Sequence, residues 1–130
     1  MDNIDYLINY LLNERNEKIN LKELSMEEKR NLFRSLCNVR PPIKISENFL
    51  NVQDKYLKEE LKKKGIVDDT KYERIQKKIY LWKGDITRLK ITAIVNAANS
   101  QGLGCFIPCH NCIDNAIHSS RRNTAKTRVL

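Results

Sequence analysis

The sequence has no apolar run that approaches the roughly 18 residues of a membrane-spanning helix. Its first five residues, MDNID, also lack the basic start of a secretory signal peptide. Internal repeats and low-complexity segments are absent as well. We therefore expect a cytoplasmic protein with no membrane partner, in which cysteines stay reduced and disulfides do not support the fold. The 130 residues suffice for one domain, or for a small helical piece joined to part of another.

Acidic residues are missing from the last twelve positions, and this absence shapes the net charge of +8. Residues 1–82 hold 17 Lys and Arg against 14 Asp and Glu, with the signs interleaved as on a solvated helical surface. Residues 119–130 add four basic residues and so supply half of the total. A basic chain can bind nucleic acid, but this basic segment has no aromatic side chains that could stack on bases. We therefore do not expect a nucleic-acid partner.

Apolar residues recur at helical spacing in two segments near the start of the chain. Residues 3–14 form the first segment, behind Asp2, which can cap a helix. In the second segment, Ser25 and Glu28 stand three positions apart, as in a capping box, and the prolines from Pro41 on end the helix. Each segment predicts an amphipathic helix. The side chains expected to be buried in the second helix are Leu32, Phe33, Leu36 and Cys37.

A third helix is predicted between Ser46, a capping residue, and Gly65, which suits the left-handed residue at a helix end. The predicted helices define a helical N-terminal extension, residues 1–74. A partial second domain is expected over residues 75–120, and residues 121–130 form an atypical basic tail. The apolar positions of the third helix are Phe49, Leu50, Tyr56, Leu57 and Leu61.

The middle of the chain changes from helical to strand-like patterns. Apolar and polar side chains alternate in residues 75–82, which predicts a strand that places Trp82 in the core. Residues 91–95 are almost continuously apolar, which predicts a strand buried on both faces, as in α/β sheets. A further helix is expected from residue 112 to about residue 119. The predicted fold class is therefore α/β, with a helical extension followed by the first part of a sheet.

Four potential metal ligands fall within eight positions: Cys105, Cys109, His110 and Cys112. Thiolate and imidazole groups suit zinc. Because there is one cluster instead of the two ligand pairs of a zinc finger, we expect three ligands and an open fourth position, with Cys109 as a spare or substitute ligand. The alternative is a loop with unrelated buried cysteines. It is less well supported, because Gly104 and Pro108 shape the loop and no core periodicity links the cysteines.

Polar side chains near the glycines can bind a ligand or shape a loop. Asp85 follows a predicted strand in a tight turn, where its carboxylate accepts either neighbouring amide protons or a ligand donor. Asn96 and Asn99 flank two alanines, and their amides suit ribose hydroxyls because each both donates and accepts hydrogen bonds. Gly102 and Gly104 permit a ligand to approach the backbone, although this spacing is a weak signal.

Three polar residues near the last predicted helix allow a structural and a functional interpretation. Asp114 and Asn115 stand at its start, where they favour the helix dipole. A hydrogen bond from Asp114 to a metal-bound imidazole is the second interpretation. His118 is expected to pack against the fold or face solvent, without binding metal.

The motifs combine into a recognisable pattern. They are G-D-I-T at 84–87, A-I-V-N-A-A-N-S at 93–100 and G-C-F-I-P-C-H-N-C-I-D-N-A-I-H at 104–118. The pattern resembles the macrodomain family, and within it the zinc-dependent bacterial branch of protein-ADP-ribose hydrolases linked to sirtuin-type transferases. Segments 38–42, 53–54 and 64–68 resemble the helical extension of that branch, so the resemblance covers roughly residues 25–118. It implies a three-layer α/β/α macrodomain.

The resemblance also implies which residues bind the ligand. Asp85 would bind the adenine amino group, Ile86 would contact the same base, and Asn99 would face the distal ribose as a catalytic residue. The zinc ligands would be Cys105, His110 and Cys112, with Cys109 outside the shell. The implied reaction is hydrolysis that releases ADP-ribose from a carboxylate side chain of a modified protein, with zinc holding or polarising the group around the anomeric bond. Lipoylated carrier proteins are the implied targets.

The resemblance stops after His118. The family continues with Ala-Gly-x-Gln-Leu-Arg and a long further segment that includes a glycine-rich loop for the diphosphate. This chain instead runs through residues 119–130 without helical or strand periodicity, which suggests a reading-frame change or a truncated gene. We therefore expect an incomplete sheet and little or no hydrolase activity from these 130 residues. The alternative function is a zinc-stabilised binding module that reads ADP-ribose or binds nucleic acid.

Overall fold

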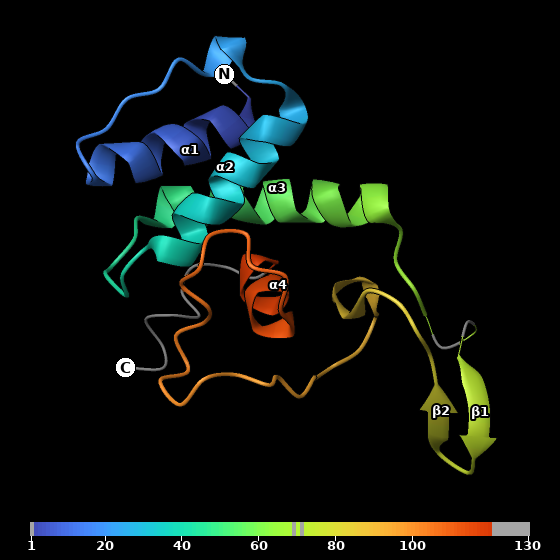
Figure 1. The fold of residues 1–130 in the computed structure, drawn as a ribbon. Helices are drawn as coiled ribbons and strands as arrows, with labels where there is room; N and C mark the ends of the chain where they lie inside the picture. Colours follow the sequence, from blue (N-terminus) through green and yellow to red (C-terminus); the bar gives the residue numbers. More distant parts are fainter. Residues whose placement is uncertain (1, 69, 71, 121–130) are drawn as a thin grey trace.

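The structure, a computed structural model, describes residues 2–68, 70 and 72–120 (Figure 1). A helical module comes first, followed by a hairpin and a long irregular segment that ends in a short helix. The elements in chain order are α1 (Asn3–Glu14), η1 (Leu21–Glu23), α2 (Met26–Val39), α3 (Glu47–Lys64), β1 (Glu73–Gln76), β2 (Ile79–Leu81), η3 (Ile86–Arg88) and α4 (Ile113–Ser119). Among the described helices, none combines the length and the apolar character needed to span a membrane.

The hydrophobic core lies between α1, α2 and α3. Helix α1 packs against both of the others, as its apolar stripe predicts. Two ring contacts connect the helices. The ring centroids of Tyr10 and Phe49 lie 4.8 Å apart, and those of Tyr56 and Phe33 lie 5.2 Å apart in an edge-on arrangement. The expected burial of Cys37 is confirmed. The buried members of this core are Ile4, Leu7, Ile8, Leu11, Leu12, Leu21, Phe33, Leu36, Cys37, Ile45, Phe49 and Leu50.

Local signals at the helix ends are confirmed in detail. The Ser25 hydroxyl accepts a hydrogen bond from the Glu28 backbone N–H (3.2 Å), and Glu28 Oε2 accepts one from the Ser25 backbone N–H (2.6 Å). That backbone N–H lowers the pKa of Glu28, because it stabilises the carboxylate. Ser46 likewise caps α3 by accepting a hydrogen bond from the Phe49 backbone N–H. Gly65 follows α3 with a φ of 85°. Asp2 precedes α1, but its side chain makes no capping hydrogen bond, so that expectation is wrong.

The predicted strand over residues 75–82 is two short antiparallel strands instead. β1 and β2 pair with Glu73 opposite Leu81, and every residue of both strands is exposed. The turn between them uses Lys78 in a positive-φ conformation (φ 66°), which side-chain alternation does not reveal. Trp82 is only half-buried and lies outside the core cluster, so its predicted place in the core is wrong. Its ring covers Gly84, where a Cβ would lie 2.5 Å from it.

The predicted buried strand over residues 91–95 is also wrong. The described residues of this segment form no ladder, and Val95 is 93% exposed. A strand buried on both faces needs paired neighbours, and the described part of the chain supplies none. An isolated parallel bridge between Val67 and Leu89 joins the residues that follow α3 to the end of η3. The described fold is therefore helical with a small two-stranded antiparallel sheet, which is compatible with part of an α/β domain.

The boundary expected after residue 74 falls inside β1, and the expected tail at 121–130 lies outside the described residues. Figure 1 shows α4 beside the helical module while the hairpin projects away from it. Helix α4 packs against α2, which precedes it in the sequence by about eighty residues. The segment that carries the Cys/His cluster is thus attached to the helical module.

Candidate metal centre

The three predicted zinc ligands meet at one place in the structure. One ligand atom each from Cys105, His110 and Cys112 lies within 4.8 Å of the other two. Tetrahedral zinc, with Zn–S near 2.3 Å and Zn–N near 2.0 Å, separates its ligand atoms by roughly 3.5 Å. Small side-chain movements therefore suffice for all three to bind one ion. Both cysteines are partly buried and His110 is exposed, so the residues fit a metal ion that keeps one side open.

The loop over residues 105–112, which we call the metal loop, folds back on itself to bring the ligands together. The backbone N–H of His110 donates to the carbonyl of Ile107 at 3.2 Å. Gly104 introduces the loop with a φ of 90°, and a Cβ there would lie 2.9 Å from Cγ of His118. Cys109 also has a positive φ, 51°. The prediction that glycine shapes this loop is supported by the conformation and close packing of Gly104.

Cys112 ends the metal loop and caps α4. Its Sγ atom accepts a hydrogen bond from the backbone N–H of Asn115 at 3.4 Å. The thiol is therefore held next to the first turn of a helix that packs against α2.

Cys109 points away from the other three residues. Its Sγ atom donates to the backbone carbonyl of Asn31 at 3.3 Å, and its backbone N–H donates to Oδ1 of Asn38 at 2.9 Å. Both Asn31 and Asn38 lie on α2. These contacts attach the middle of the metal loop to the helical module and leave Cys109 outside the cluster of three ligand atoms.

Two residues on α2 hold this region in place, and neither was predicted from the sequence. Arg34 bonds to the side chain of Asn115 and to the carbonyl of His110, and Asn38 bonds to Cys109 and Ser119. Their spacing of four residues places both on one face of the helix, beside its apolar stripe. A polar pair at this spacing is a signal, but the sequence does not state which distant segment it contacts.

Asp114 contacts residues other than the proposed ligands. Its Oδ1 atom accepts a hydrogen bond from Nδ2 of Asn96 at 2.9 Å and lies 3.4 Å from Nε2 of His118. The contacts in the described chain therefore pair this carboxylate with His118 and not with His110. Oδ1 of Asn96 is buried and has no hydrogen-bond partner among the described residues.

Asp85 lies at the start of η3, where it acts as a turn former. Its Oδ1 atom accepts hydrogen bonds from the backbone N–H (2.9 Å) and the hydroxyl (2.6 Å) of Thr87, and its Oδ2 atom lies 3.7 Å from Nζ of Lys64. Partial burial by itself raises the pKa of Asp85, but the Thr87 hydrogen bonds and the Lys64 ammonium outweigh it and lower that pKa. The carboxylate is therefore ionised at neutral pH.

Ile86 and Asn99 occupy different surroundings. Ile86 lines a cavity of about 450 Å³ together with apolar residues of the 89–94 segment and Ile117. Asn99 donates from Nδ2 to the carbonyl of Gly104 at 3.0 Å, and its Oδ1 accepts from the backbone N–H of Gly102 at 3.1 Å. Asn99 thus positions the residue before Cys105, whereas no described contact joins Asp85 to the metal loop.

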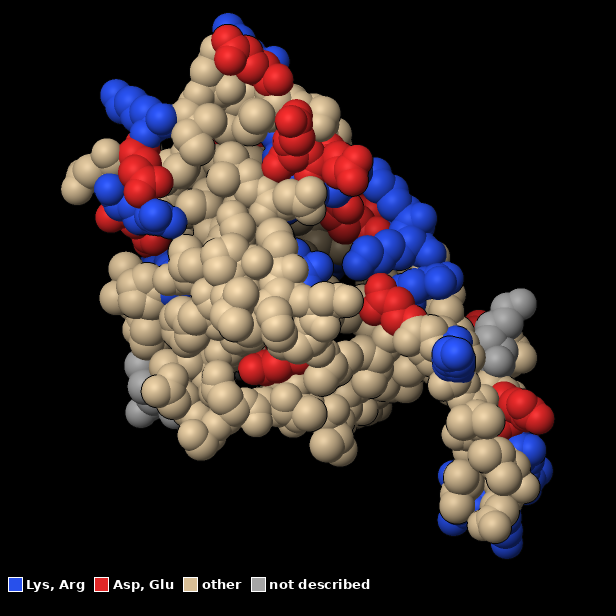
Figure 2. Space-filling view, viewed as in Figure 1, with Lys and Arg blue, Asp and Glu red and all other residues tan. Residues whose placement is uncertain are grey.

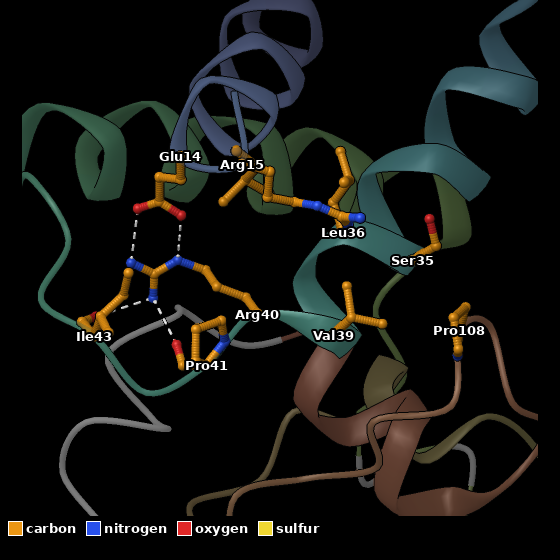
Figure 3. Close-up of a pocket in the computed structure, with 10 residues that line it drawn as sticks. Glu14, Arg15, Ser35, Leu36, Val39, Arg40, Pro41, Ile43 and Pro108 are labelled. Carbon is orange, nitrogen blue, oxygen red and sulfur yellow. Dashed lines mark hydrogen bonds and ion pairs between the residues drawn. The ribbon is translucent and has the colours of Figure 1, made fainter. Parts of the chain in front are cut away.

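A second cavity, of about 490 Å³, lies where the ends of α1 and α2 meet Pro108 of the metal loop (Figure 3). Its lining is mostly apolar, and the ion pair of Glu14 with Arg40 closes one side. None of the predicted ligand-binding or metal-binding residues lines this cavity. Pro108 is the residue of the metal loop that lines it.

The segment that contains the metal loop carries little charge of its own. Asp114 is the only Asp, Glu, Lys or Arg in residues 91–120. Figure 2 shows charged side chains of both signs along the upper part and right edge of the molecule, while the lower left is almost free of them. The basic side chain that contacts the metal loop comes from α2 instead, where Arg34 donates to the carbonyl of His110.

Comparison with known proteins gives this site a context. No protein family model matches the sequence. A protein of Treponema medium named "Protein-ADP-ribose hydrolase" is 45% identical over 119 residues, which cover 88% of this chain and 46% of the relative. A protein of the same name from Staphylococcus aureus strain MRSA252 is 44% identical over 118 residues, covering 89% of this chain and 44% of the relative.

A fungal protein matches a shorter stretch more closely. The "Probable bifunctional ADP-ribose hydrolase/ADP-ribosyltransferase" of Fusarium oxysporum f. sp. cubense is 70% identical over 43 residues, which are 32% of this chain and 7% of the relative. The chain spans about half the length of the curated bacterial relatives it matches. Over most of its own length, this chain is a homologue of bacterial proteins named protein-ADP-ribose hydrolase.

Proposed function

We propose that this protein is a zinc-dependent hydrolase of the macrodomain family that removes ADP-ribose from modified proteins. The observation that carries the proposal is the convergence of Cys105, His110 and Cys112 in a chain homologous to proteins named for this activity. One line of support is the geometry of three side chains, and the other is sequence identity along most of the chain.

In this proposal the two cysteine thiolates and the imidazole of His110 hold zinc at the open side of the metal loop. A bound zinc ion supplies a Lewis acid and a coordination position for an oxygen of the substrate or of water. Asn99, next to the metal loop through its bond to Gly104, orients the distal ribose. Its exposed side chain lies in a segment without charged residues, so neutral hydroxyl groups are the chemistry it suits.

The adenosine end of the ligand is assigned to the region of η3. Asp85 uses Oδ1 for Thr87, so its Oδ2 atom is the oxygen that accepts a hydrogen bond from the adenine amino group. Ile86 lines the apolar cavity of about 450 Å³, which suits the face of a base. The buried Oδ1 atom of Asn96, which has no hydrogen-bond partner in the described part of the chain, is an acceptor that a ligand hydroxyl would satisfy.

The finer features of the proposal rest on the motif resemblance. They are membership of the sirtuin-linked branch, ADP-ribose attached through a carboxylate side chain, a lipoylated carrier protein as the target, and a cytoplasmic location. The names of the homologues state only that a protein-ADP-ribose bond is hydrolysed.

Release of ADP-ribose from an ADP-ribosylated carrier protein tests the activity. The purified chain is used in excess over the substrate, so that slow release is also measured, with and without added zinc. Because the sequence predicts little activity from these 130 residues, we expect only slow release, which requires zinc and which Cys105→Ala, His110→Ala and Cys112→Ala each abolish. Release that is unchanged by these substitutions would contradict the proposal.

Binding of free ADP-ribose tests the adenine site separately. Asp68 offers a matched control for Asp85, because it also accepts hydrogen bonds from the backbone N–H and the hydroxyl of the threonine two positions later. We expect Asp85→Ala to weaken binding, measured by calorimetry, at least about tenfold, since one charge-assisted hydrogen bond is lost. Asp68→Ala should leave the affinity unchanged. Equal effects of the two substitutions would refute the assignment of Asp85.

A further inference from the structure

The side chain of Arg34 connects α2 to the metal loop. Its Nε and Nη2 atoms donate to Oδ1 of Asn115, at 3.0 and 2.8 Å. Nη2 also lies 3.3 Å from the carbonyl oxygen of His110, to which it donates. A planar guanidinium can make these bonds together because its donors have a fixed fork geometry. Arg34 therefore contacts the backbone of one proposed ligand directly.

Asn115 extends this contact to the other end of the metal loop. Its side chain is fully buried, and Nδ2 donates to the carbonyl of Ile107 at 2.9 Å. Its backbone N–H donates to Sγ of Cys112. One buried amide thus links Arg34 to the start of the loop and to a second proposed ligand.

The middle of the loop depends on α2 as well. Cys109 has a positive φ, which non-glycine residues seldom adopt and which persists only where the surroundings hold it. Here Asn38 accepts a hydrogen bond from the backbone N–H of Cys109, and the carbonyl of Asn31 accepts one from the thiol of Cys109. The metal loop is therefore held by α2 at several points along its length.

We propose that Arg34 is a positioning residue of the metal centre. Through its bonds to Asn115 and to the carbonyl of His110, it holds His110 and Cys112 close together before the metal arrives. The side chains of residues 106–110 are exposed, so the loop buries little apolar surface that could order it otherwise. Without Arg34, part of the free energy of metal binding is spent on ordering the loop, and the affinity falls. This inference rests on the proposed function to the extent that these residues bind zinc.

Zinc affinity is the quantity to measure, by competition with a chromophoric chelator on the full chain. We expect Arg34→Gln to bind zinc about 10- to 100-fold more weakly, the usual effect of removing a group that orients metal ligands. Absorption of the cobalt-loaded protein at saturation should keep the thiolate charge-transfer bands of the wild type, because the ligands themselves are unchanged. Arg34→Lys keeps the charge but not the fork, so an intermediate affinity is expected.

Arg30→Gln is the matched control. Arg30 lies one turn earlier on α2, but its Nε atom bonds to Glu60 of α3 at 3.1 Å and not to the metal loop. We expect its zinc affinity to stay within about twofold of the wild type, although its thermal stability falls. A role of Arg34 in stability alone would lower the melting temperature of both variants and leave both zinc affinities unchanged.

Three outcomes separate this inference from the proposed function. A wild-type chain that binds no zinc refutes the proposed metal centre and this inference with it. If the wild type binds zinc, and Arg34→Gln and Arg34→Lys both bind it with the affinity of the wild type, this inference is refuted and the metal centre is not. If Arg34→Gln fails to fold by far-ultraviolet circular dichroism, Arg34→Lys decides: wild-type affinity refutes the positioning role, and weakened affinity with wild-type helicity supports it.

Discussion

Arg40 and Glu14 form a bidentate ion pair, in which Nε and Nη2 of the arginine donate to the two carboxylate oxygens at 2.9 Å each (Figure 3). The arginine side chain is only 3% exposed. It also donates to the carbonyls of Ile43 (3.0 Å) and Lys44 (3.2 Å), in the turn that follows α2. The pair therefore joins the end of α1 to the connection between α2 and α3.

Replacing Arg40 with Met should destabilise the fold by about 2 kcal/mol, because two carbonyls and the carboxylate of Glu14, whose side chain is 21% exposed, lose their donor. Urea denaturation followed by circular dichroism measures the change. Arg15→Met is the control, since Arg15 pairs with Glu17 at the surface, where an ion pair contributes about 0.5 kcal/mol or less. Similar losses in the two variants would contradict a special role for the pair of Arg40 and Glu14.

Alkaline pH should destabilise the helical module through Tyr56. Burial raises the pKa of Tyr56 to about 12, with a further contribution from the charge of Glu60. Tyrosine in an unfolded chain has a pKa near 10. The stability linked to the protonated phenol is thus fully present below about pH 10 and is lost as the pH rises toward 12.

The measurement is the thermal midpoint at several pH values between 9 and about 12. We expect the thermal midpoint of Tyr56→Phe to fall less steeply with pH than that of the wild type, because the variant lacks the partly buried phenol that ionises. Tyr80→Phe, on the exposed face of β2, is the control and should follow the wild-type curve. A slope for Tyr56→Phe equal to that of the wild type would refute the assignment.

Local signals in the sequence predicted the helical module and the cluster of Cys105, His110 and Cys112. The caps of α2 and α3 are hydrogen bonds between residues three positions apart, from Ser25 to Glu28 and from Ser46 to Phe49. Residues so close in the sequence are sufficient to predict them. The three proposed metal ligands also fall within eight positions, so their proximity is partly a consequence of their short separation in the chain.

The contacts that support the metal loop could not be predicted in this way. Arg34 and Asn115 are 81 residues apart in the sequence, and nothing in either neighbourhood names the other. The predicted strand over residues 91–95 was wrong for a related reason. An apolar run indicates that burial is favourable, but the pairing that makes a strand depends on neighbours elsewhere in the chain.

Gly104 should be sensitive to substitution at the entrance to the metal loop. Gly104→Ala strains a backbone at φ 90° and places a Cβ 2.9 Å from the ring of His118. We expect a loss of about 1–3 kcal/mol in stability and weaker zinc binding, because the carbonyl of Gly104 also anchors Asn99.

Gly65→Ala separates the two effects. Gly65 also has a positive φ, 85°, but its Cβ would meet only the flexible end of Arg88 at 3.4 Å. The expected result is a similar backbone cost with unchanged zinc affinity. Equal zinc affinities in both alanine variants and the wild type would show that packing at Gly104 does not shape the metal centre.

The two cysteines at positions 109 and 112 should differ in their effect on zinc. Cys109 donates its thiol proton to the carbonyl of Asn31 and lies outside the ligand cluster, whereas Sγ of Cys112 lies within it. Metal analysis of the purified variants is expected to find close to one zinc per chain in Cys109→Ala and little in Cys112→Ala.

A small loss of stability is still expected for Cys109→Ala, because the thiol bond to α2 disappears while the backbone bond to Asn38 remains. Competition with a chelator distinguishes this loss from a ligand role: removing one of three protein ligands weakens zinc binding far more than loosening the loop does. Zinc content that falls in Cys109→Ala and persists in Cys112→Ala would mean that the loop rearranges on metal binding and that Cys109 replaces Cys112 as a ligand.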